Sequence, residues 1–103
     1  MALSVTFTGR PLVANEDDRS ITFTDLGLDW AGEGYTLALR VTDPDGTAVE
    51  HSLVAVVGTA TSAKLSSVSG VFTQDGVYTL KIIAYSGTDP RLYSVDYYVY
   101  VRP

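Results

Sequence analysis

The chain has 103 residues, no cysteine and a formal net charge of −5, with 46% hydrophobic and 18% charged residues. A chain of this size normally makes one compact unit, so we expect a single domain over residues 1–103. The negative charge and the absence of a Lys or Arg cluster argue against nucleic acid, and the lack of cysteine excludes disulfides and thiolate metal sites. No apolar run approaches the ~20 residues that span a bilayer, so no membrane partner is expected.

Period-two alternation of β-branched and aromatic residues predicts strands throughout and no helix. The predicted strands, in chain order, are Leu3–Thr8, Ser20–Leu28, Tyr35–Thr42, Thr47–Val57, Ala63–Phe72, Val77–Tyr85 and Tyr93–Arg102. The alternation slips by one after Phe23, which predicts a bulge near Thr24 or Asp25. About seven strands at this spacing predict an all-β protein built as an antiparallel sandwich.

Two turn signals connect these strands. The sequence DPDG at Asp43–Gly46 predicts a tight hairpin in which Gly46 takes a left-handed conformation. A second turn is predicted at Gly87–Pro90, between the last two strands. In the strand before the hairpin, apolar residues alternate with others. This alternation places Leu37, Leu39 and Val41 inward and Arg40 on the outer face.

The sequence DGVY at Asp75–Tyr78 starts a strand whose alternate positions are apolar. This pattern is typical of a tyrosine corner, in which the Tyr78 hydroxyl bonds to nearby backbone and Leu80 takes the place of the usual disulfide cysteine. With the strand spacing, these residues resemble the immunoglobulin-like superfamily, especially its cysteine-free bacterial and phage members. The resemblance implies an Ig-like β-sandwich and carries over only Asp75, Gly76, Tyr78 and Leu80. Trp30 departs from the pattern, because it follows Phe23 too closely to be the tryptophan that packs on the disulfide position.

Catalytic and metal-binding patterns are absent from the sequence. His51 is the only histidine and is predicted to lie on a strand, where it has no expected nucleophile. Oxygen ligands for calcium are offered by Asp43, Asp45 and Asp89, or by Glu16–Asp18, but neither set has the spacing of a dedicated calcium loop. We therefore expect no enzyme activity, no metal and no cofactor.

The outer face of the last two strands is the candidate binding site. The predicted contact residues are Arg40, Ile83, Tyr85, Tyr98 and Tyr100. Tyrosine and arginine are enriched at the centres of protein contacts, and this face is expected to be flat and lightly charged. The alternative interpretation is that outward tyrosines only satisfy strand propensity and cross-strand pairing. The low overall charge favours an interface, and an unpaired first strand at Leu3–Thr8 offers a second docking route.

These features favour a non-enzymatic structural or binding module. The first residues lack the basic start and apolar run of a secretory signal, so we expect no export, and the family resemblance implies assembly in the host cytoplasm. The family resemblance implies a phage virion accessory protein, such as a head-decoration or tail component, that docks onto capsid or tail proteins or onto its own copies. The alternative is a carbohydrate-binding or adhesion module with a glycan stacked on a platform of Trp30, Tyr85, Tyr98 and Tyr100.

Overall fold

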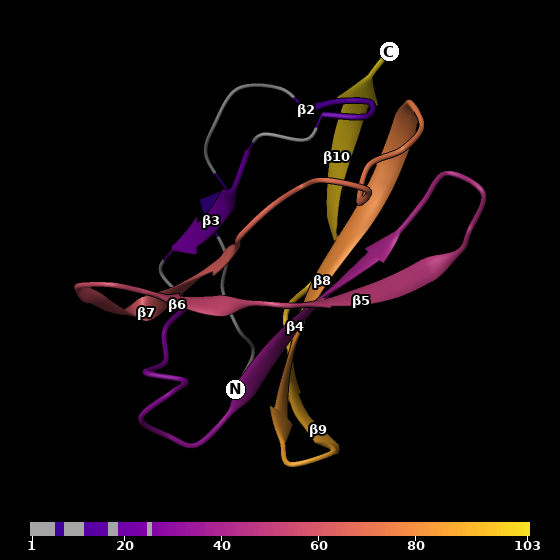
Figure 1. Cartoon of the computed structure of the whole chain (residues 1–103). Coiled ribbons are helices and arrows are strands. Elements are labelled where there is room, and N and C mark those ends of the chain that lie inside the picture. Colours follow the sequence, from indigo (N-terminus) through magenta and orange to yellow (C-terminus); the bar gives the residue numbers. More distant parts are fainter. Residues whose placement is uncertain (1–5, 8–11, 17–18, 25) are drawn as a thin grey trace.

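The protein is all-β, with its strands in two sheets (Figure 1). The structure is a computed structural model that describes residues 6–7, 12–16, 19–24 and 26–103. The first sheet has the order β1-β3-β7-β6, with bounds Thr6–Phe7, Ile21–Thr24, Thr59–Leu65 and Val54–Val56. The second has the order β2-β10-β8-β4-β5, with bounds Leu12–Val13, Tyr97–Arg102, Gly76–Ser86, Thr36–Thr42 and Ala48–Ser52. The strand β9 (Asp89–Tyr93) also pairs with β8.

The expectation of a purely antiparallel fold is wrong at one strand pair. β2 lies parallel to β10, with Leu12 opposite Val101, so the second sheet is mixed and curls into a half-barrel. The long strand β8 organises this sheet, because β4 pairs along one side of it while β10 and then β9 pair along the other. Most of the predicted first strand, including Leu3–Val5, lies outside the described residues, and its two described residues pair antiparallel with β3.

The middle of the chain departs most from the predicted strand boundaries. The single predicted strand Thr47–Val57 is two strands in different sheets, β5 and β6, which are joined at the buried residue Leu53. The Leu53 amide still donates to the Leu37 carbonyl at 3.0 Å, so the chain leaves the second sheet only after that bond. The prediction of a strand over Ala63–Phe72 is also wrong, because β7 ends at Leu65 and a loop follows.

The core lies between the inner faces of the two sheets. Its buried members are Leu12, Ile21, Phe23, Leu26, Trp30, Leu37, Leu39, Val41, Leu53, Ala63, Leu65, Val68, Phe72, Tyr78, Leu80, Ile82, Ala84 and Val101. This confirms the inward alternation predicted for β4. The predicted strand Ser20–Leu28 is wrong beyond Thr24, where β3 ends, and Asp25, one of the two positions predicted for a bulge, lies outside the described residues. Leu26 returns to the core, and its amide donates to the Thr61 carbonyl at 2.9 Å.

The predicted hairpin and tyrosine corner are both confirmed and lie against each other. At the hairpin, Gly46 has φ +91° and its amide donates to the Asp43 carbonyl at 2.9 Å. At the corner, the Tyr78 hydroxyl donates to the Gln74 carbonyl at 2.9 Å and accepts from the Gln74 amide at 3.1 Å. The Gln74 side chain also donates to Asp45 at 3.2 Å, which links the corner to the hairpin.

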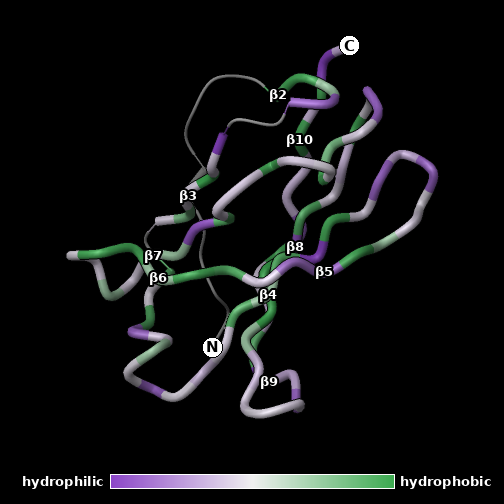
Figure 2. Tube along the Cα trace, in the orientation of Figure 1, coloured by the Kyte–Doolittle hydropathy of each residue, from purple (hydrophilic) through white to green (hydrophobic). Residues whose placement is uncertain are grey.

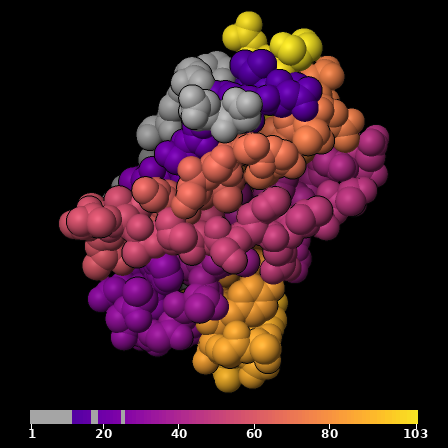
Figure 3. Space-filling model, in the orientation of Figure 1, coloured from indigo at the N-terminus to yellow at the C-terminus, as the bar shows by residue number. Residues whose placement is uncertain are grey.

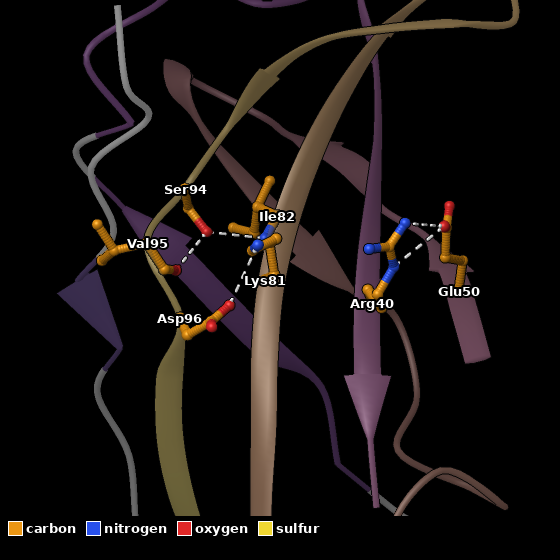
Figure 4. Close-up of polar contacts among 7 residues, drawn as sticks. All are labelled: Arg40, Glu50, Lys81, Ile82, Ser94, Val95 and Asp96. Atoms are coloured by element: carbon orange, nitrogen blue, oxygen red, sulfur yellow. Dashed lines mark hydrogen bonds and ion pairs between the residues drawn. The ribbon is translucent and has the colours of Figure 1, made fainter. Parts of the chain in front are cut away.

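The predicted strand Tyr93–Arg102 is interrupted at residues 94–96. Ser94 bridges the gap: its amide donates to the Ile82 carbonyl at 2.9 Å, and its hydroxyl accepts from the Ile82 amide at 2.9 Å (Figure 4). The same hydroxyl donates to the Val95 carbonyl at 2.8 Å. The interruption reverses the alternation, so Tyr93 lies on the outer face opposite Ile83. The predicted turn Gly87–Pro90 is shorter, because β9 begins at Asp89.

Replacing Ser94 with alanine is expected to lower the free energy of unfolding by about 1–2 kcal/mol, because the buried Ile82 amide loses its acceptor. Urea unfolding followed by circular dichroism measures this difference. Ser86→Ala, at an exposed position on the same sheet, is the matched control and should change the free energy of unfolding little. An equal loss in both variants would contradict the bridging role of the Ser94 hydroxyl.

Candidate functional site

The outer face of the second sheet is organised in rows by the strand register. One row pairs Tyr100 with Val77, and the next pairs Tyr98 with Thr79. The following row carries the charged residues Lys81, Arg40 and Glu50 in directly opposed positions. Beyond it, a row of Tyr93, Ile83 and Ala38 crosses β9, β8 and β4. The face therefore has tyrosines at both ends and charges in between.

The end of the face near the tyrosine corner presents the most exposed aromatic surface among the described residues. Tyr98 is 70% exposed and Tyr100 is 58% exposed, and both point outward as predicted. Val77, opposite Tyr100, is 55% exposed. We call these three residues the tyrosine patch. Each tyrosine offers a large apolar ring with a polar tip, which suits contact with another molecule.

A charged band crosses the middle of the face, so the expectation of a lightly charged surface is wrong. Arg40 donates from Nε and Nη2 to one oxygen of Glu50 at 3.3 and 3.0 Å, and Lys81 Nζ lies 3.4 Å from Asp96 (Figure 4). Arg40 and Lys81 are directly opposite each other, which is unfavourable for like charges. One carboxylate on the far side of each cation, Glu50 beside Arg40 and Asp96 beside Lys81, offsets that repulsion.

The electrostatics of the band are set by Glu50. The Tyr85 hydroxyl donates to its second carboxylate oxygen at 2.7 Å, and this bond, followed by the bonds from Arg40, lowers the pKa of Glu50. The same bond raises the pKa of Tyr85, because the phenolate would lose it. The bond to Glu50 also raises the pKa of Arg40. The three groups therefore hold one another in the protonation states that they have at neutral pH.

Ile83 is removed from the predicted contact set. It lies on the outer side of β8, as the alternation predicts, but none of its surface is exposed. Its cross-strand neighbours are Ala38 and Tyr93, and Lys81 extends over the Tyr93 ring with Nζ 5.7 Å from the centroid. These neighbours close over Ile83, so it supports the face from below and cannot touch a partner.

The remaining predicted residues fall into two groups that do not touch. Arg40 and Tyr85 meet through Glu50, and Tyr85 is only half-exposed. Tyr98 lies opposite Thr79, which is six positions from Tyr85 along β8, or about 20 Å at strand spacing. A shallow hollow of about 220 Å³ separates the groups; its lining residues are Arg40, Thr42, Thr79, Lys81 and Asp96. The hollow exists because two short threonines lie beside long charged side chains.

The other residues singled out in the sequence do not form a second site on this face. Trp30 is only 7% exposed and donates from Nε1 to the Ser62 carbonyl at 3.0 Å, so it cannot join a glycan platform with the tyrosines. His51 lies half-buried on β5 at the predicted position.

The carboxylates weighed above as calcium ligands are placed apart in the described part of the chain. Asp43 and Asp45 lie in the β4–β5 turn, and Asp89 lies in β9 at the opposite end of β8 (Figure 1). Both turn carboxylates already accept hydrogen bonds. Asp43 Oδ1 accepts from the amides of Asp45 and Thr47 at 3.0 and 2.9 Å, and Asp45 accepts from the Gln74 side chain. The acidic set Glu16–Asp18 lies partly outside the described residues. Where residues are described, no group of three or more His, Asp or Glu side chains is placed to hold a metal ion.

Comparison with known proteins returned no match: no family model, no curated protein and no solved structure corresponds to this chain. In the described ranges, no helix is long and apolar enough to cross a membrane.

Three residues of this face are missing from the predicted contact set. Glu50 is one of them, although the DPDG hairpin fixes the register that puts it opposite Arg40. The position of Val77 directly before the inward corner tyrosine predicts that its side chain faces outward. Asp96 pairs with Lys81 only because the chain is irregular at 94–96, and no local pattern signals that irregularity.

Proposed function

We propose that this chain is a non-enzymatic docking module that binds a partner protein through the tyrosine patch. The observation that carries the proposal is the exposure of Tyr98 (70%) and Tyr100 (58%) on consecutive outward positions of one strand, with Val77 beside them. Exposed tyrosines at this density have no role in the core of this domain. They match the residue type that dominates binding energy in protein contacts.

The charged band complements the tyrosine patch in this proposal. Arg40 and Lys81 are fixed by their own carboxylates, so a partner would meet charges in defined positions and pay little to order them. Exposed ion pairs add little binding energy but favour one orientation of the partner. The patch would therefore supply affinity, and the band would supply specificity and register.

We infer further that the fold is an Ig-like sandwich. The strand order supports this inference: the sequence β1-β3-β7-β6 corresponds to the A-B-E-D order of Ig-like domains, and β10-β8-β4-β5 corresponds to G-F-C-C′. The tyrosine corner at the start of β8 and the buried Leu80 two residues later also support it. The short strands β2 and β9 are additions to that plan.

The narrowest form of the proposal is a phage virion accessory protein, a head-decoration or tail component assembled in the host cytoplasm. Its support is the resemblance of the cysteine-free strand pattern and the tyrosine corner to Ig-like domains of phages. The partner in that case is a capsid or tail protein. The carbohydrate-binding alternative is less well supported, because Trp30 is buried and the Tyr85 hydroxyl is already bonded.

The test is a double substitution, Tyr98→Glu with Tyr100→Glu, in a virus that encodes this chain. We expect the variant to be absent from purified particles, because two charges would be buried against the partner. Quantitative mass spectrometry of gradient-purified particles measures its amount relative to the wild-type chain. The isolated variant should keep its melting temperature, since both rings are exposed.

The matched control is Val49→Glu, on the same sheet. Val49 is 51% exposed but lies opposite the inward residue Val41, so it points away from the tyrosine patch. Wild-type amounts of the Val49 variant on particles, with loss of the double variant, would support the patch. Retention of the double variant on particles would refute it.

A further inference from the structure

The hollow of about 220 Å³ on the outer face lies between two positive charges. Arg40 on β4 and Lys81 on β8 are direct cross-strand neighbours, and so are Thr42 and Thr79 in the next row. All four line the hollow, together with Asp96. The charged row lies midway along the second sheet, between the β4–β5 hairpin and the β8–β9 hairpin, which lie at opposite ends of the molecule (Figure 3).

The charges of this row follow one order across the sheet. Glu50 on β5 comes first, then Arg40 on β4, Lys81 on β8, and Asp96 on the far side of β8. The two anions thus lie at the ends of the row and the two cations at its centre. Adjacent strands are about 4.8 Å apart, so a group placed between β4 and β8 is nearest to the two strands that carry the cations. Figure 2 shows hydrophilic stretches in this middle part of the sheet, next to hydrophobic ones.

Both cations have N–H groups to spare. Arg40 uses Nε and Nη2 for Glu50; among the described residues its Nη1 makes no hydrogen bond, and in Figure 4 this nitrogen points toward β8. Lys81 Nζ lies 3.4 Å from Asp96, beyond the length of about 2.7–3.2 Å of a well-formed N–H···O bond. The side chains of Arg40 and Lys81 are 40% and 31% exposed, so another molecule can reach both.

We propose that this hollow receives the carboxylate of an aspartate or glutamate side chain of the partner protein, which bonds to Arg40 Nη1 and Lys81 Nζ. The proposal rests on the docking function proposed for the tyrosine patch, since Tyr98 lies opposite Thr79, which lines the hollow. A carboxylate is the anion that an unmodified protein surface supplies. It bridges the two opposed cations and so offsets the repulsion between them.

The net charge of −5 makes the hollow selective. At physiological salt, exposed charges are screened beyond about 8 Å, so the charges around the hollow decide whether a carboxylate binds there. Elsewhere the excess of acidic residues disfavours an acidic partner group. A carboxylate next to an apolar contact surface would therefore dock in one register, with the carboxylate in the hollow and the apolar surface on the tyrosine patch.

Zero-length cross-linking with a carbodiimide tests the contact, because it joins a lysine amine to a carboxylate that touches it. The chain has two lysines, and Lys64, on β7 of the other sheet, is the internal control. On gradient-purified particles that carry the chain, we expect Lys81 and not Lys64 to be joined to an aspartate or glutamate of the partner, as mapped by tandem mass spectrometry. Lys81→Arg should dock normally and lose the cross-link, because it keeps the charge but has no amine to couple.

Titration of the purified chain onto particles that lack it measures the energetic role of the contact. Lys81→Met should raise the dissociation constant about tenfold, because the carboxylate of the partner loses a cation in a partly desolvated contact. Lys64→Met is the matched control and should bind as the wild-type chain does. Both variants should keep the wild-type melting temperature, since each lysine side chain is partly exposed.

Wild-type affinity of Lys81→Met would overturn the inference, as would cross-links from Lys64 as abundant as those from Lys81. Loss of binding after phosphatase treatment of the particles would also overturn it, because the anion would then be a phosphate. The tyrosine patch is tested separately by Tyr98→Glu with Tyr100→Glu. If that double variant fails to dock while Lys81→Met docks normally, the carboxylate contact is refuted and the proposed function stands; if the double variant docks, the proposed function itself is refuted.

Discussion

Replacing Gly76 with alanine is expected to lower the free energy of unfolding by about 3 kcal/mol, through two separate causes. Gly76 has φ +127°, a conformation that residues with a Cβ rarely adopt. A Cβ at this position would also lie 2.8 Å from Cγ of Pro44, the ring at the tip of the β4–β5 hairpin. Chemical denaturation of the purified variant measures the loss.

Two controls separate these causes. Gly46 also has a positive φ, +91°, but a Cβ there meets nothing within 4 Å, so Gly46→Ala measures the conformational cost alone, about 1 kcal/mol. Adding Pro44→Ala to the Gly76 variant removes the closest atom and should recover part of the stability. Equal losses in Gly76→Ala and Gly46→Ala would mean that the short distance to the Pro44 ring adds nothing to the conformational cost.

The features that the sequence predicts correctly are those encoded within a few neighbouring residues. The DPDG turn needs only its own four residues, and the tyrosine corner needs only a bond between Gln74 and Tyr78. The outward direction of Tyr98 and Tyr100 follows from alternation within one strand. In each case the local pattern and the final structure agree, as expected for a sequence whose local and global preferences are consistent.

The features that the sequence does not predict depend on partners distant in the chain. Ile83 is buried because β9 and β4 flank it, and alternation along β8 alone makes it look exposed. The break at Ser94 is invisible in a run of alternating residues, because its cause is a bond to Ile82 on another strand. Similarly, nothing local marks Leu53 as the residue at which the chain changes sheets.

Replacing Tyr78 with alanine is expected to lower the free energy of unfolding by about 4 kcal/mol, the range for emptying a large buried aromatic site. Tyr78 is 1% exposed, and its ring meets Phe72 edge-on with the centroids 5.1 Å apart. Alanine removes that contact and leaves a cavity between the sheets. It also removes the hydroxyl that holds the segment before β8. Urea denaturation monitored by circular dichroism measures the change.

Tyr78→Phe is the control that isolates the hydroxyl, because it keeps the ring and the core volume. It should cost about 1–2 kcal/mol, since the Gln74 carbonyl and amide lose their shared partner in a partly buried position. Backbone hydrogen exchange at Gln74 should accelerate in this variant while exchange in the centre of β8 stays slow. Wild-type stability in Tyr78→Phe would mean that packing alone holds the corner, and that the segment joining β7 to β8 is positioned by Phe72 and not by the tyrosine hydroxyl.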